Sequence, residues 1–502
     1  MPSVSKSTLL AGAALSILWL AVNCLLASRF NMASGDSILY ALPLAVAKNP
    51  FDLGVPFLSD FDGFGTSWGH QWPGAMWLRG FVFWIIPYQR IADVAVLLLF
   101  QWGVAMAVMG IVWKATRKTW AALAAAILIL SDRLMLLACA GNRFETIAVF
   151  CVVMLLADSH GPEPRGRAWR WSLGFLAFLC PTTHPYALAL GGLILAFNLT
   201  GSLLWQKSRL RESVCKCVCF IAGIAAAAAW FVYQPAAMRQ FTNNLALQHS
   251  FFTNWNSVFQ QLSNYRFGGG WLLWVAALAA GGWLLRKPLP PSVRLLTPLL
   301  FAGVIAMQTI TRCENFHYLV FGTPSAVIMV CVAAARIADG PSLVPRAAAA
   351  AFILLLLGLH ATILPYRIIQ FARAGFPDLG KDVSQVLEDL PADRAVYIPH
   401  VFWPAAVHDS KHAIRWWTLP IASPRETRQS YEKTTFAKAR PGDYLIVDNG
   451  TAGTIDKFGL LPTYPLLPPD PARWTLFRNE KKLFSGSVPW GLDVSIYEFR
   501  TP

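Results

Sequence analysis

The chain has 502 residues, of which 55% are hydrophobic and only 14% are charged, and its mean hydropathy is +0.46. Soluble globular proteins carry about 25% charged residues, so this composition excludes an ordinary soluble fold over most of the length. The net charge of +15 lies before residue 375, because residues 375–502 contain 15 Lys and Arg against 15 Asp and Glu. Nucleic-acid binding is a poor explanation for this charge, since no basic stripe occurs in a polar segment.

Eleven apolar runs approach the length of about 20 residues that a helix needs to cross a bilayer. They are residues 8–28, 92–113, 119–138, 144–157, 170–183, 185–205, 214–234, 270–286, 295–311, 317–337 and 345–366. The fourth and fifth runs are short, and only PTTHPY separates the fifth from the sixth. We therefore predict a membrane all-α fold, a polytopic bundle of about eleven transmembrane helices.

Basic residues recur in every second connection between these runs. They are Lys114, Arg117 and Lys118; Arg165, Arg167 and Arg170; Lys207, Arg209, Arg211 and Lys216; Arg286, Lys287 and Arg294; and Arg336 and Arg346. Cytoplasmic loops carry such an excess of Lys and Arg. The pattern predicts a cytoplasmic N-terminus and places the other connections and the C-terminal region on the outer side.

Two outer regions are long enough to have structure of their own. In the first outer loop, 29–91, residues 36–48 and 74–88 read as helices that lie in the interface without spanning. After residue 374 the composition becomes mixed and polar, with a helical pattern at 379–390 and strand-like segments AVYIPH, DYLIVDNG, WTLFRNE and DVSIYEFR. We predict two domains: a transmembrane domain, 1–374, and a small outer α/β domain, 375–502.

The unusual ionisable residues near the spans all belong to the predicted outer side. They are Asp36, Asp60, Asp62, His70, Arg143, Glu145, His184, Arg239, His249, Arg266, Arg312, Glu314 and His317. Charges near hydrocarbon are costly and usually serve a site or face water. A channel or ion-coupled transporter would place them at mid-membrane depth. Their common side instead indicates a site that acts on something held at the outer surface.

Four short motifs occur in order among these residues. They are SGDSILYA around Asp36, HQWPG from His70, NRFE with Arg143 and Glu145, and HYL from His317 followed by Pro324. Together they resemble the Asp-Glu-x-x-Tyr, His-x-Pro, Arg-x-Glu and Arg-Tyr-Leu…Pro segments of GT-C-type glycosyltransferases. That class includes protein O-mannosyltransferases and aminoarabinose transferases, which take a sugar from a polyprenyl-phosphate or polyprenyl-diphosphate carrier. The similarity covers roughly the first 340 residues.

The resemblance implies a role for each matched residue. Asp36 would be the general base that removes the proton of an acceptor hydroxyl, a contribution of about 10²–10⁴-fold. Glu145 and His70 would orient the acceptor or an arginine. The donor phosphate would be bound by Arg143, Arg312, His317 and Tyr318, because arginine pairs with phosphate oxygens in a planar fork. The single displacement would invert the anomeric centre.

Two positions depart from the family pattern, and several residues have a second interpretation. Ser37 stands where the family has a second acid, and His317 replaces an arginine, for which Arg312 could substitute. Asp36 also suits a helix N-cap, and Asp60 and Asp62 suit either a turn or a divalent-cation site.

Simple structural roles also remain open for five further residues. Arg143 and Glu145 could be an ion pair that closes a turn, and His184 could cap one. Arg239 and Arg266 lie in a long outer loop that could be a substrate lid or a solvated connection.

The sequence therefore predicts a glycosyltransferase in a bacterial inner membrane, acting on its periplasmic face. The expected partners are membrane lipids, a polyprenyl-phosphate-sugar donor and a lipid, glycan or protein acceptor, with no nucleic acid. No cofactor or resident metal is predicted, although a divalent cation is possible, and the oligomeric state is not predicted. The alternatives are a lipid or polysaccharide transporter or flippase, and a membrane-anchored assembly protein.

Overall fold

The computed structural model describes residues 6–29, 73–141, 143–160, 166–204, 207–233, 270–310, 316–373, 378–399, 402, 406, 409, 411–417, 436–449, 469–484 and 490–500. The helices are α1 (Lys6–Arg29), α3 (Pro73–Ile85), α4 (Arg90–Thr116), α5 (Thr119–Leu130), α6 (Arg133–Ala140), α7 (Glu145–Ser159), α8 (Arg167–Thr183), α9 (Pro185–Leu204), η2 (Lys207–Arg209), α10 (Leu210–Tyr233), α13 (Gly270–Leu284), η4 (Ser292–Leu296), α14 (Thr297–Ile310), η5 (Phe316–Phe321), α15 (Thr323–Ala338), α16 (Leu343–Ala361), α17 (Ile363–Arg373) and α18 (Leu379–Glu388). The strands are β1 (Ala395–Pro399), β2 (Ala413–Trp417), β3 (Tyr444–Asp448), β4 (Trp474–Phe484) and β5 (Trp490–Phe499).

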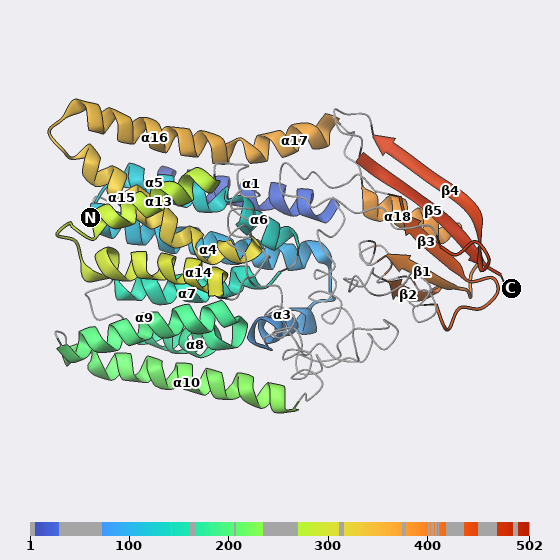
Figure 1. The fold of residues 1–502 in the computed structure, drawn as a ribbon, viewed down its shortest axis with the longest axis horizontal. Helices are drawn as coiled ribbons and strands as arrows, with labels where there is room; N and C mark the ends of the chain where they lie inside the picture. The colour runs from blue at the N-terminus through green and yellow to red at the C-terminus, as the bar shows by residue number, and fades with distance from the viewer. Residues whose placement is uncertain are drawn as a thin grey trace.

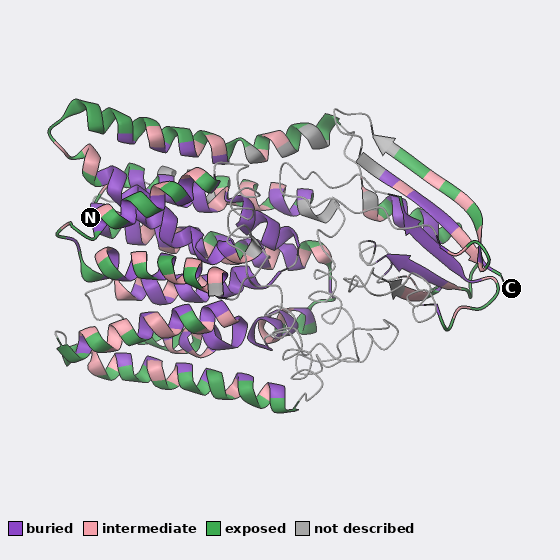
Figure 2. Cartoon of the chain, viewed as in Figure 1, coloured by how far each residue is buried: buried purple, intermediate pink, exposed green. Residues whose placement is uncertain are grey.

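The helices form a bundle, and the sheet lies beyond one of its ends (Figure 1). In the middle of the bundle α15 is buried on all sides, with every residue from Thr323 to Ala335 out of solvent. Such a helix belongs to a core. The peripheral helix α16 instead exposes large apolar side chains, such as Leu343 at 75% and Leu354 at 68% (Figure 2). That outward apolar surface is what a bilayer requires.

Helices stand where the spans are predicted, but not all of them are long enough alone. Within the described residues five helical stretches are long and apolar enough to cross a membrane, and the bent pair α5–α6 would be a sixth. Helices α13 and α15 are apolar but shorter, and α7 and α8 have 15 and 17 residues. The chain is a multi-pass membrane protein, while the count of eleven spans stays a prediction.

The third predicted span, 119–138, is not one straight helix. It breaks after Leu130, and α5 and α6 meet at 41°. Asp132 lies at the break, and its side chain accepts a hydrogen bond from the Met135 N–H at 2.9 Å. An aspartate that caps a helix in this way begins a new helix and does not continue the old one.

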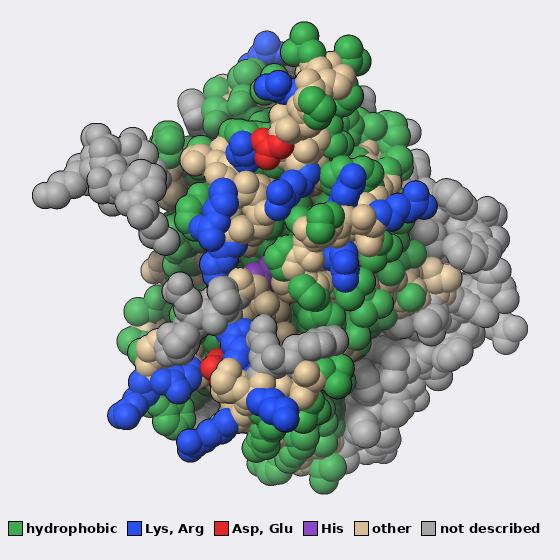
Figure 3. All heavy atoms as spheres, turned by 90° about the vertical axis from the view of Figure 1, so that its left-hand side faces the viewer, with side chains coloured by type: hydrophobic (Ala, Val, Ile, Leu, Met, Phe, Trp, Pro, Cys, Tyr) green, Lys and Arg blue, Asp and Glu red, His purple; other side chains and the backbone are tan. Residues whose placement is uncertain are grey.

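The helix predicted at 74–88 is found as α3, while its place in the membrane interface stays a prediction. The other predicted interfacial helix, 36–48, lies outside the described residues. The basic connections gather at the end of the molecule opposite the sheet, where Figure 3 shows a face rich in Lys and Arg. One-sided charge of this kind is typical of a membrane protein's cytoplasmic face.

The sheet has the strand order β2-β1-β3-β5-β4. Strand β1 pairs in parallel with β2 and β3, whereas β5 pairs antiparallel with β3 and β4. Helix α18 covers one face with Val383, Val386 and Leu387, and the other face carries an aromatic cluster around Trp474 and Tyr397. Four strands and α18 confirm the expected segments; β2 was not predicted, since AIRWW follows a short polar stretch without alternation.

Candidate functional site

The structure describes only part of the predicted site. Arg143, Glu145, His184 and Tyr318 are described, and η5 includes the backbone of His317 but not its side chain. The residues outside the described part of the chain are Asp36, Asp60, Asp62, His70, Arg239, Arg266 and Arg312. The four described residues belong to the connections α6–α7 and α8–α9 and to η5, at the end of the bundle that faces the sheet (Figure 1).

Arg143 and Glu145 form a buried ion pair at the start of α7. The Arg143 Nε and Nη2 atoms donate to Glu145 Oε1 at 2.9 and 2.6 Å. The two side chains are 2% and 1% exposed. The other carboxylate oxygen, Glu145 Oε2, is buried without a hydrogen-bond partner in the described residues. The pair thus fixes the arginine fork and leaves one acceptor unused.

His184 lies at the centre of an aromatic cluster. Its ring centroid is 4.9 Å from those of Tyr318 and Phe321, 5.5 Å from Tyr186 and 5.7 Å from Phe144. These contacts join the α6–α7 connection, the start of α9 and η5. The Arg-x-Glu, His184 and His-Tyr-Leu segments, far apart in the sequence, therefore meet in one place, as their common predicted side requires.

The protonation state of His184 follows from its surroundings. His184 Nδ1 accepts the Tyr186 N–H at 3.1 Å, so the neutral ring carries its hydrogen on Nε2. Burial, and secondarily the nearby Arg143 cation, lower the pKa of His184 below its ordinary value. The ring is therefore a neutral hydrogen-bond donor at physiological pH and not a cation.

Helix α3, which belongs to the second half of the predicted outer loop 29–91, is held by two buried contacts. Arg79 Nε donates to Asp93 Oδ1 at 2.8 Å, Arg79 Nη2 donates to Oδ2, and both side chains are fully buried. Gly74 packs so closely on α8 that a Cβ there would overlap Thr182 Oγ1. Thr182 is two residues before His184, so the Gly74 contact places the start of α3 beside the His184 cluster.

Two residues at this end of the bundle were not predicted from the sequence. Asp93 stands in the first turn of an apolar span, where an unpaired carboxylate would be costly. Its position in the sequence therefore indicated that a cationic side chain pairs with it. Gln308 is 3% exposed, and both its amide atoms lack a hydrogen-bond partner in the described residues. In the sequence, Gln308 is distinguished by its amide, which stands in a run of apolar residues and threonines.

Gln308 lies at the depth of the aromatic cluster. A Cβ at Gly303 would contact the Leu190 side chain of α9 at 3.5 Å. From that contact α14 rises about 7.5 Å to Gln308, and the antiparallel α9 rises about 6 Å to Tyr186. The amide is therefore near the level of Tyr186, which stacks on Phe321.

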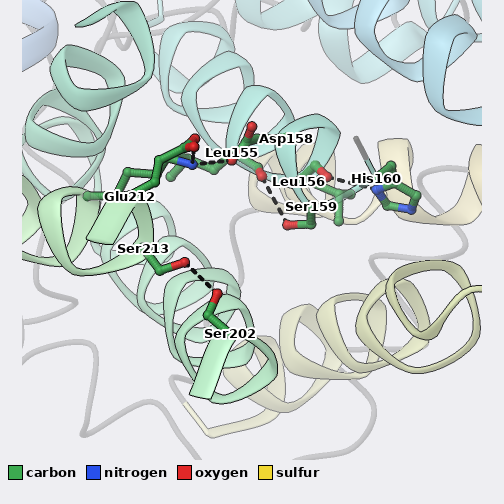
Figure 4. Close-up of polar contacts among 9 residues, drawn as sticks. Leu155, Leu156, Asp158, Ser159, His160, Ser202, Glu212 and Ser213 are labelled. Carbon is green, nitrogen blue, oxygen red and sulfur yellow. Dashed lines mark hydrogen bonds and ion pairs between the residues drawn. The ribbon is translucent and has the colours of Figure 1, made fainter. Parts of the chain in front are cut away.

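A second polar cluster lies at the opposite, basic end of the bundle (Figure 4). Lys216 pairs with Asp158 and, at 2.8 Å, with Glu212, and Ser202 and Ser213 hydrogen-bond at 2.8 Å. These contacts tie α10 to α7 and α9. Lys216, Asp158 and the two serines are buried, whereas Glu212 is 27% exposed, and their contacts with one another are those of a structural cluster. No group of three or more His, Cys, Asp or Glu within the described residues could hold a metal ion.

No family model matches the sequence, and no curated protein sequence matches it. The fold is shared with solved structures of ArnT. The ArnT structure from Cupriavidus metallidurans bound to undecaprenyl phosphate has a TM-score of 0.57 and 15% identity and covers 98% of both chains. The apo structure has a TM-score of 0.52 and 16% identity, covering 97% of this chain and 98% of that chain.

Proposed function

We propose that the protein is an inverting glycosyltransferase that moves a sugar from a polyprenyl-phosphate carrier to a lipid, glycan or protein acceptor. The supporting observation is the ArnT fold over 98% of both chains, sheet domain included, in a relative bound to undecaprenyl phosphate. The meeting of Arg143, Glu145, His184 and Tyr318 at one end of the bundle agrees with it. We further propose a bacterial inner-membrane location, with the sheet domain and the site on the periplasmic side, because the basic end lies opposite (Figure 3).

The proposed chemistry is a single displacement. The acceptor hydroxyl oxygen bonds to the anomeric carbon, Asp36 takes its proton, and the bond to the carrier phosphate oxygen breaks. The leaving phosphate gains negative charge, which cations and hydrogen-bond donors fixed nearby would stabilise. Arg143, Arg312, His317 and Tyr318 are proposed for that role. Glu145 orients Arg143 and, with His70, the acceptor.

The test is a donor-turnover assay on purified full-length protein. A panel of radiolabelled polyprenyl-phosphate sugars is supplied with a crude envelope acceptor fraction, to wild type and Asp36→Asn. We expect label to reach the acceptor with wild type only, and transfer by the variant to fall about 10²–10⁴-fold. Equal transfer by both would remove Asp36 from the mechanism. Neither consumption nor binding of any donor by folded wild type would contradict the function and favour a transporter.

A further inference from the structure

Helices α4 and α7 enclose an apolar groove that is separate from the His184 cluster. Its volume is about 660 Å³, and it follows α4 from Val96 to Lys114, with Phe150 and Met154 of α7 on its other side. Val96 and Lys114 are five helical turns apart, about 27 Å along the axis. That length approaches the ~30 Å thickness of a bilayer's hydrocarbon core, so the groove can hold an extended hydrocarbon chain.

Small residues on one face of α4 create the groove. At Gly103 a Cβ would stand 2.6 Å from the Phe150 ring, which therefore lies on the helix backbone. At Gly110 a Cβ would meet no atom within 4 Å, so this glycine borders open space. Leu99 and Trp102, at the rim, are 54% and 38% exposed. The groove thus opens sideways, toward the surface that lipid chains cover.

One end of the groove is charged. Among the lining residues of the described chain Lys114 is the one ionisable side chain, and it stands in the last turn of α4. The α4–α5 connection that follows it is one of the basic connections. Trp169, a residue type that favours the membrane interface, lines the groove as well.

We propose that this groove binds one acyl chain of an anionic phospholipid, with the lipid phosphate at Lys114. The apolar walls require a hydrocarbon chain, and the cationic end selects a negative headgroup at the same depth. A second copy of this chain is a poorer occupant. Inserted with the same orientation, it would bring its own basic end against Lys114, and like charges repel.

The experiment counts retained lipids on the delipidated, detergent-purified protein by native mass spectrometry. The probes are phosphatidylglycerol and phosphatidylcholine with identical acyl chains, offered separately at several concentrations. Gly110→Leu fills the open space of the groove, and Lys114→Gln removes its charge without changing the packing. The matched controls are Gly282→Leu, whose Cβ also meets nothing within 4 Å, and Lys287→Gln, at the same basic end.

Wild type is expected to retain one phosphatidylglycerol more tightly than phosphatidylcholine. Lys114→Gln should weaken the binding of phosphatidylglycerol about fivefold, the effect of one cation near a lipid phosphate. Gly110→Leu should abolish lipid binding in the groove. The controls should bind as wild type does. Equal retention of the two lipids, unchanged binding in Lys114→Gln, or equal losses in the controls would overturn the proposal. A dimer that dissociates in Gly110→Leu, without lipid loss, would assign the groove to a second copy.

Discussion

The Arg143 guanidinium donates through both Nε and Nη2 to the same oxygen of Glu145, at 2.9 and 2.6 Å, so that the second carboxylate oxygen stays without a partner in the described residues. A purely structural pair would gain more from a two-oxygen fork. Under the proposed function this oxygen would accept a hydrogen bond from a substrate hydroxyl. The pair orients the Arg143 guanidinium and leaves Glu145 Oε2 without a hydrogen bond from the described residues.

Breaking this pair on one side should be costly. Glu145→Leu removes the carboxylate that pairs with the buried Arg143 cation, and we expect it to destabilise the protein by about 3–5 kcal/mol. Arg143→Met/Glu145→Leu removes both charges and should restore most of that stability. Thermal unfolding in detergent measures this difference.

The double variant then separates a structural role from a functional one. If the pair serves the donor, the double variant folds but retains little undecaprenyl phosphate by native mass spectrometry. Retention as strong as in wild type would leave Arg143 and Glu145 with a structural role only.

The Arg79–Asp93 pair predicts a contrast between buried and exposed ion pairs. Asp93→Ala removes one partner of a pair that is fully buried, so the expected loss is about 3–5 kcal/mol. Lys118→Gln breaks the Lys118–Asp339 pair, whose side chains are 40% and 44% exposed, and should cost under about 1 kcal/mol. The thermal unfolding midpoints of the two variants test this order. Equal midpoints would mean that α3 is held mainly by its apolar face.

We expect Gln308 to support function without adding to stability. Its buried amide has no partner in the described residues, so Gln308→Leu removes an unmet polar group and should leave stability unchanged or raise it by up to ~1–3 kcal/mol. Under the proposed function the same change should weaken donor transfer. Gln308→Glu keeps the shape as a control for packing. A Gln308→Leu protein that is less stable would instead show that the amide has a structural partner.

Asp409 predicts acid sensitivity in the sheet domain. Burial raises its pKa, but the His412 ring, 3.0 Å away, and the N–H groups of Lys411 and His412, at 2.7 and 3.1 Å, outweigh burial and hold the pKa below 3.8. A lowered carboxyl pKa stabilises the fold above the unfolded value and loses that contribution as the pH falls through the folded value. The contribution should therefore be complete above about pH 4 and disappear below it.

Hydrogen exchange of the intact chain measures this effect. At each pH the protection of residues 411–417 is compared between wild type and Asp409→Asn, so that the intrinsic pH dependence of exchange cancels. We expect wild type to be the better protected above pH 4 and the difference to narrow in stronger acid. A difference in protection that grows as the pH falls would contradict the lowered pKa of Asp409.

Much of the architecture was predictable, because hydropathy is a local property. Runs such as 92–113 and 345–366 are apolar over the length of a span, so α4 and α16 follow directly. The segments DYLIVDNG and DVSIYEFR have the residue types of buried strands, and β3 and β5 confirm them. The side of each basic connection was likewise readable from its place between two spans.

The partners of individual side chains were not predictable in the same way. The sequence by itself determined that Arg143, Glu145, His184 and Tyr318 belong to one end of a membrane bundle. Only the tertiary structure decided that His184 meets the Tyr318 ring, that Arg79 pairs with Asp93, and that Gln308 is buried without a described partner. Hydrophobicity assigns a segment to lipid or water wherever it occurs, whereas a buried polar group takes its partner from elements that packing brings together across the chain.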